Sequence, residues 1–150
     1  MKAVVVAAAL ALAAQTVAAQ EKTPDMVRYT TEQSFEDVAF GIESAIVDAG
    51  LVVDHVSHVG EMLERTRADV GSDKVLFTKA DVYSFCSAKV SRSVMEADPM
   101  NIVYCPYDIF VAELADKPGE VFVGYRQFPE GPMQEVQAML DGIVRAALGD

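Results

Sequence analysis

Hydrophobic positions repeat at two different spacings along the chain, and these spacings predict helices that alternate with strands. From Phe35 to Ala49, apolar residues recur every three or four positions, as on one face of an amphipathic helix. Ser34 and Asp37 resemble a capping box at the start of this segment, and Gly50 stands where a left-handed residue commonly ends a helix. A helix is therefore predicted over residues 35–49.

The rest of the chain alternates in the same way between β-branched runs and amphipathic segments. The residue before a proline disfavours the α region, so Asp98 and Pro99 end the helix that begins near Cys86. Pro106 interrupts a long apolar run, which implies an edge strand, a bulge or a strand start. The predicted strands are residues 26–30, 51–59, 75–85, 101–114 and 120–126, and the further predicted helices are residues 61–70, 86–97 and 133–148.

The order of these elements predicts an α+β fold with a largely antiparallel sheet of four to five strands. The turn at residues 116–119 contains Pro118 and Gly119 and joins two strands as a hairpin, whose arms are antiparallel. Helices packed on one face of the sheet would bury that face. The opposite face then needs cover, and a homodimer is one way to supply it.

The first residues have the layout of a secretory signal peptide. Met1 and Lys2 precede an apolar run from Ala3 to Ala14, and small residues follow up to a predicted cleavage point after Ala19. The run is shorter than the roughly 20 residues that a membrane-spanning helix needs. We therefore expect a signal peptide over residues 1–19, an N-terminal arm and first strand over 20–33, and a single α+β domain over 34–150. The expected location is the periplasm or the extracellular space, with no membrane attachment after cleavage.

Composition and charge limit the kinds of molecule that the protein is expected to bind. A chain of 150 residues is long enough for one domain. Its 23 acidic residues outnumber its 12 basic ones, which gives a formal net charge of −11. Such a charge repels phosphate groups, so nucleic acid is not expected as a partner.

Two cysteines, Cys86 and Cys105, are the chain's most suggestive chemical feature. If the strand after Cys105 runs back beside the strand that ends at Phe85, the two sulfurs can approach each other. The structural interpretation is a disulfide that closes a loop of about 20 residues. Cys86 also lies at a predicted strand-to-helix junction, where exposed N–H groups and the helix dipole favour a thiolate. A reactive or metal-binding thiol pair, and two buried thiols without a bond, therefore remain as alternatives.

Other side chains offer weaker signals. His58 and Met100 could join the cysteines as soft ligands for copper or zinc, although ordinary surface or core positions explain them equally simply. The spacings of zinc proteases, thioredoxins, c-type haem proteins, calcium loops, serine hydrolases and phosphate loops are missing. We therefore predict no catalytic residue and no cofactor. The residues predicted to line a small cleft beside the cysteines, or else to pack in the core, are Tyr83, Tyr104, Pro106, Tyr107 and Tyr125.

A series of landmarks resembles a known family. They are Ser34 to Val38, Phe85-Cys86-Ser87, Ala97-Asp98-Pro99 and Cys105-Pro106-Tyr107. In this order they resemble the domain of unknown function 302 family, over about residues 34–126. The resemblance implies a compact α+β domain, frequently dimeric, without an agreed biochemical activity.

The resemblance also bears on the cysteines. Many members of that family carry Cys-Asn-Pro where this chain has Cys86, Ser87 and Ala88, a departure that changes the local turn. Cys105 resembles a feature of exported bacterial members, which agrees with its pairing to Cys86.

These observations lead to two expectations for function. The first is an exported, noncatalytic module that binds a small ligand or a partner and is stabilised by a disulfide between Cys86 and Cys105. The second is a protein that acts through these cysteines in thiol redox, sulfur-handling or metal-binding chemistry. The redox behaviour of the pair distinguishes them, because a bridge of low reduction potential favours a structural role.

Overall fold

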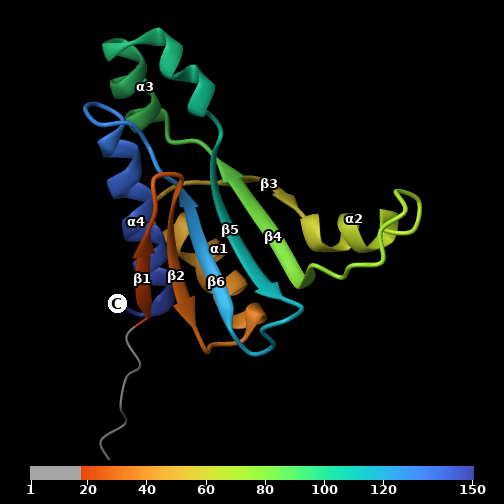
Figure 1. Cartoon of the computed structure of the whole chain (residues 1–150). Coiled ribbons are helices and arrows are strands. Elements are labelled where there is room, and N and C mark those ends of the chain that lie inside the picture. Colours follow the sequence, from red (N-terminus) through yellow and green to blue (C-terminus); the bar gives the residue numbers. More distant parts are fainter. Residues whose placement is uncertain (1–17) are drawn as a thin grey trace, which may run out of the picture.

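Six antiparallel strands form one sheet in the computed structural model, which describes residues 18–150 (Figure 1). The strand order is β1-β2-β6-β5-β4-β3, and every neighbouring pair is antiparallel. The α+β class and the antiparallel sheet are thus confirmed, with one strand more than the four to five expected. The strands are β1 (Ala19–Lys22), β2 (Met26–Thr31), β3 (Val53–Ser57), β4 (Phe77–Phe85), β5 (Tyr107–Leu114) and β6 (Val121–Arg126).

The additional strand is β1, where the sequence predicted the end of a signal peptide and a loose arm. It pairs with β2, and all four of its residues are exposed, so its sequence has no hydrophobic alternation. Most of the predicted signal peptide lies outside the described residues, and its cleavage after Ala19 stays a prediction. No helix in the part of the chain that the structure describes is long and apolar enough to cross a membrane.

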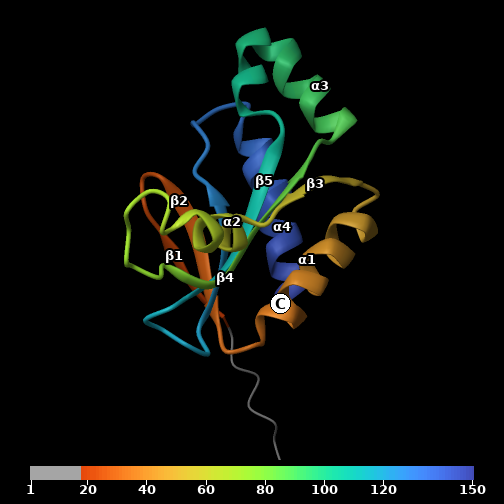
Figure 2. The same cartoon turned by 90° about the vertical axis from the view of Figure 1, so that its right-hand side faces the viewer.

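Two long helices, α1 (Phe35–Asp48) and α4 (Gln134–Leu148), pack together on one face of the sheet (Figure 2). The Ser34 hydroxyl accepts a hydrogen bond from the Asp37 backbone N–H at 3.1 Å, and Gly50 follows the helix with a φ of 76°. Both observations confirm the predicted ends of α1. Between helices and sheet lies the apolar core, which includes Ile42, Ile46, Ile109, Val111, Val123, Val136, Leu140 and Val144.

Helix α2 (Val59–Thr66) packs along β4 instead of covering the sheet face. The strand β3 pairs only with the second half of β4, and α2 continues along the first half (Figure 1). A Cβ atom on Gly60 would lie 2.7 Å from the Ala80 backbone nitrogen, so glycine permits this close approach. The predicted helix 61–70 ends early, and Met62 and Val70 are exposed because α2 lies beside the core.

Between β4 and β5 the chain makes an excursion that we call the α3–η1 lobe, residues 87–105. It consists of α3 (Ala88–Ala97) and a 3₁₀ helix, η1 (Pro99–Tyr104), and it projects beyond the end of the sheet (Figure 1). The prediction of a strand from residue 101 was wrong for residues 101–106, because β5 begins at Tyr107. The Asp98 carboxylate accepts a hydrogen bond from the Met100 N–H at 2.9 Å, and Pro99 supplies a helical φ at the first position.

Candidate functional site

The two cysteines lie together at the base of the α3–η1 lobe. Phe85 and Tyr107 are cross-strand partners at the ends of β4 and β5, so Cys86 leaves the sheet where Cys105 returns to it. The two Sγ atoms are 2.9 Å apart, and both cysteines are free thiols. Cys86 is exposed and Cys105 is half-buried. The predicted approach of the sulfurs is confirmed, whereas the bond between them stays a prediction.

Aromatic side chains tie the lobe to the sheet beside the thiols. The Tyr107 hydroxyl lies 3.0 Å from the Ser91 hydroxyl of α3. The Phe128 ring lies 5.7 Å from the Tyr104 ring and 6.3 Å from the Tyr107 ring, measured between centroids. These contacts hold both arms of the lobe close to the sulfurs.

The surroundings raise the pKa of the Cys86 thiol to about 12. Although the residue as a whole is exposed, partial burial of its sulfur is the largest cause, and the neighbouring Cys105 thiol and the Asp54 carboxylate add to it. The expectation of a favoured thiolate at the start of α3 is therefore wrong. Cys86 precedes the N-cap residue, and the Ser87 hydroxyl takes the hydrogen bond from the Val90 N–H at 3.3 Å.

The aromatic residues predicted as cleft lining have different positions. Tyr83, Tyr107 and Tyr125 are buried in the core, where the Tyr125 hydroxyl donates to the Asp141 carboxylate at 2.6 Å. Tyr104 is half-buried against that core, and Pro106 is exposed. Tyr104, Pro106 and Tyr107 lie within two residues of Cys105 in the chain. Tyr83 and Tyr125 pack in the hydrophobic core.

Of the two proposed soft ligands, His58 lies away from the thiols and faces another partner. Met100 is exposed on η1, and His58 Nδ1 lies 2.9 Å from the Asp81 carboxylate. Asp81 precedes Cys86 by five residues, which corresponds to roughly 16 Å of strand. Residues 18–150 contain no group of three or more His, Cys, Asp or Glu side chains placed to hold a metal ion.

A second polar site, which the sequence did not indicate, lies at the other end of β4. We call it the α1–α2 groove, because α1 and α2 form its walls and β4 its floor, and its volume is about 1060 Å³. His58 and Asp81 meet there, and Lys79 forms an ion pair with Glu36. Hydrogen bonding to Asp81 and its negative charge raise the pKa of His58. Three separate segments contribute these side chains, so no single sequence motif predicts the groove.

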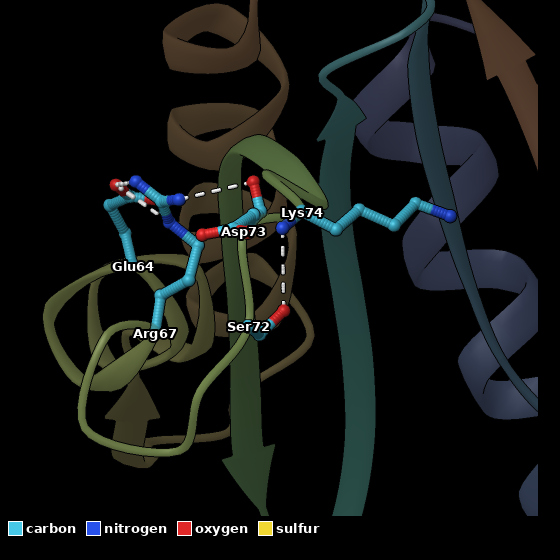
Figure 3. A network of polar contacts seen from close by, with 5 residues as sticks. All are labelled: Glu64, Arg67, Ser72, Asp73 and Lys74. Atoms are coloured by element: carbon cyan, nitrogen blue, oxygen red, sulfur yellow. Dashed lines mark hydrogen bonds and ion pairs between the residues drawn. The ribbon is translucent and has the colours of Figure 1, made fainter.

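The wall formed by α2 is fixed by polar contacts to the loop that follows it. Figure 3 shows the Arg67 guanidinium between Glu64 and the backbone of Asp73. Arg67 donates to the Glu64 carboxylate at 2.9 Å and to the Asp73 carbonyl oxygen at 3.1 Å. The contacts hold Glu64 at the rim of the groove and fold the loop back towards α2.

Comparison with known proteins identifies the family. The model of the family described as "Domain of unknown function DUF302" matches residues 27–146, most of the chain. The chain therefore belongs to the DUF302 family. The expected membership is thus confirmed, although Ser87 and Ala88 replace the Asn-Pro expected after the family's cysteine.

A solved structure supports the same fold. The crystal structure of an uncharacterized conserved DUF302 protein from Bacillus stearothermophilus is similar to this chain, with a TM-score of 0.53 and 15% sequence identity. The similarity covers 81% of this DUF302 chain and 88% of the other chain. No curated protein matches the chain. DUF302 membership therefore establishes the fold, and the function has to be argued from the side chains.

Proposed function

We propose that the chain is an exported, noncatalytic binding module whose α3–η1 lobe contacts a protein partner, with a Cys86–Cys105 disulfide holding the lobe in place. The observation that carries the proposal is the 2.9 Å separation of the two sulfurs at the base of the lobe. A disulfide has an S–S distance of about 2.05 Å, so the bond requires a shift of roughly 1 Å. Such a bond would close the lobe into a covalent loop.

The exposed surface of η1 supports a protein as the partner. Met100, Ile102 and Val103 are 69%, 59% and 72% exposed, which is unusual for adjacent large apolar side chains. Apolar side chains grouped on a surface commonly mark an interaction site. These three residues lie on one short helix that projects from the fold (Figure 2), a shape that fits a recess on a partner. We therefore place the contact with the partner on η1.

The raised pKa of Cys86 supports a noncatalytic role. A nucleophilic cysteine acts as its thiolate, and catalytic cysteines have a lowered pKa. Burial and the neighbouring Cys105 thiol instead raise the pKa of Cys86 to about 12. This environment stabilises the protonated thiol or a disulfide and disfavours a nucleophile at neutral pH.

Photo-crosslinking in the producing cells tests the lobe directly. A photoreactive amino acid in place of Ile102 should give a discrete adduct of higher mass, and the adduct should diminish in the Cys86→Ser variant. Val70 is also exposed and apolar but lies in the loop after α2, so the same substitution there is a matched control. Equal adducts at both positions, or none at position 102, would refute a partner on η1.

The alternative is thiol redox or metal chemistry at the same pair. It is favoured by the exposure of Cys86 and by the free state of both thiols. Equilibration with glutathione buffers separates the two functions. A structural bridge should stay oxidised under the most reducing buffer, whereas a bridge that opens readily would favour redox chemistry.

Homodimerisation is a separate part of the proposal. The face of the sheet opposite α1 carries Val82 and Phe110, which are cross-strand partners and only half-buried. A second copy packed there would cover them. Sedimentation at micromolar concentration should give a dimer that Phe110→Glu converts to a monomer, and a monomeric wild-type protein would remove this part of the proposal.

A further inference from the structure

The α1–α2 groove has the shape of a ligand site. Its volume of about 1060 Å³ is at the upper end of the range found for small-molecule sites. Buried Phe35 and half-buried Phe77 give it an apolar base, and Phe40 stands in its wall with 72% of its surface exposed. An aromatic side chain so exposed in a concave wall gains from a ligand that covers it.

The groove also carries more negative than positive side chains. Its lining contains five carboxylates, from Glu36, Glu43, Glu61, Glu64 and Asp81, against two permanent cations, Lys79 and Arg65. Glu36, Glu64 and Asp81 are engaged by Lys79, Arg67 and His58. Among residues 18–150, Glu43 and Glu61 find no ion-pair or side-chain hydrogen-bond partner. Two carboxylates on opposite walls are thus available to a ligand.

The protein's own Lys79 shows how this groove accommodates an ammonium group. Its Nζ atom lies 5.7 Å from the centre of the Phe35 ring and pairs with the Glu36 carboxylate. An aromatic face and a carboxylate together form the environment that attracts an organic cation. Phe40 and Glu43 offer the same two groups three residues apart on α1, without an internal cation.

From this repeated arrangement we infer that the α1–α2 groove binds a small organic cation, an ammonium group on an apolar body. The ammonium lies between Glu43 and Glu61, and the apolar body covers Phe40 and Phe77. Close approach of Gly60 to the backbone of Ala80 holds the α2 wall against the β4 floor of the groove. The overall charge of −11 favours the approach of such a ligand at low salt. The inference does not depend on the partner proposed for the lobe.

Titration of the full, isotopically labelled chain with phenethylammonium tests the inference by nuclear magnetic resonance. The amides of α1 and α2 around Phe40 and Glu61 should shift and reach saturation. The anion 3-phenylpropionate, which carries the same phenethyl body, is the matched ligand control and should shift none of them. Raising the salt concentration should weaken the binding of the cation, because screening reduces the attraction of exposed carboxylates.

Three variants locate the binding groups. Glu43→Gln and Glu61→Gln should each weaken binding by about two- to fivefold, and their combination by about tenfold, as expected for exposed ion pairs. Phe40→Leu should weaken it by a further two- to fivefold through loss of the cation–π contact. Glu130→Gln removes the same charge from the exposed loop before α4 and should leave the dissociation constant unchanged.

Four outcomes would overturn the inference. One is a set of shifts that does not saturate, and another is equal binding of the anion. The third is an unchanged dissociation constant in the Glu43 and Glu61 variants that still give the amide spectrum of the wild-type fold. A binding constant lowered equally by Glu130→Gln would likewise show a general charge effect and contradict the site.

Discussion

The two ends of β4 differ in every property that decides chemistry. At its end, Phe85 is fully buried and Cys86 meets a second thiol beside aromatic side chains. At its beginning, Lys79 and Asp81 carry charges that are neutralised in pairs beside an open groove. One strand therefore connects a junction of two thiols and aromatic side chains with an open groove lined by ion pairs.

The difference shows what each end can do. Burial of the sulfur and the neighbouring Cys105 thiol raise the pKa of Cys86, which disfavours a nucleophilic role for this residue. In the groove, the Glu43 and Glu61 carboxylates have no partner among the described residues and are available to a ligand. We propose that the cysteine end maintains structure and that the groove end provides recognition, and the following predictions test this proposed division.

The largest expected effect is the loss of the bridge. Cys86→Ser, Cys105→Ser and reduction of the wild-type protein should each lower the free energy of unfolding by about 3 kcal/mol, because each releases a loop of about 20 residues in the unfolded chain. Chemical denaturation with and without reductant measures this. Reductant should not affect the two variants, and an unchanged midpoint for the wild-type protein on reduction would contradict the structural role.

The next largest expected effect is slow alkylation of Cys86 in the reduced protein. A rise of the Cys86 pKa from 9.0 to about 12 lowers its thiolate fraction at neutral pH about 1000-fold. The intrinsic nucleophilicity rises about 20-fold in return, so alkylation should be about 50-fold slower than for a free cysteine. Peptide mass mapping after timed alkylation resolves the two sites. The Cys105→Ser variant should increase the rate at which Cys86 is alkylated. In the wild-type protein, an alkylation rate of Cys86 equal to that of a free cysteine would contradict the raised pKa.

Glycine substitutions test the packing of the groove wall. Gly60→Ala should lower the free energy of unfolding by about 1–3 kcal/mol, because the new methyl group collides with the backbone of β4. Gly142→Ala in α4 meets no atom within 4 Å and should stabilise the protein by about 0.5–1 kcal/mol through helix propensity. Denaturation curves for both variants check the contrast. A neutral or stabilising Gly60→Ala would show that α2 does not depend on this contact.

The smallest effect concerns His58. Asp81 and, to a lesser extent, Glu61 raise the pKa of His58 above 6.5 in the folded protein. Its stabilising contribution is therefore complete below about pH 6.5 and is lost as the pH rises through the folded pKa. Nuclear magnetic resonance titration of the imidazole should show the raised pKa and its return towards 6.5 in Asp81→Asn. The same titration curve in both proteins would remove Asp81 as the cause.

The sequence was sufficient to predict those parts of the fold that neighbouring residues determine. The ends of α1 follow from Ser34 and Gly50, and the meeting of the cysteines follows from antiparallel β4 and β5. Strand β1 was missed because all its residues are exposed, and η1 because Asp98 and Pro99 begin a new helix within an apolar run. β1 depends on pairing with β2 and η1 on capping by Asp98, and the spacing of hydrophobic residues predicts neither of them.

The candidate site divides in the same way. The thiol pair could be anticipated, because only two cysteines exist and the strand order brings them together. The direction of the Cys86 pKa shift could not be anticipated, because it depends on burial of the sulfur and on the neighbouring Cys105 and Asp54 side chains. The groove was missed because it arises where α2 leaves the sheet, a tertiary feature that combines residues from α1, α2 and β4.

Mass mapping of the mature protein, alkylated under denaturing conditions without reductant, tests the fastening of the lobe most directly. The account predicts one crosslinked peptide pair that contains Cys86 and Cys105, with neither cysteine alkylated until reductant is added. Complete alkylation of both cysteines in protein recovered from an oxidising compartment would contradict it, and the lobe would then depend on its noncovalent contacts alone.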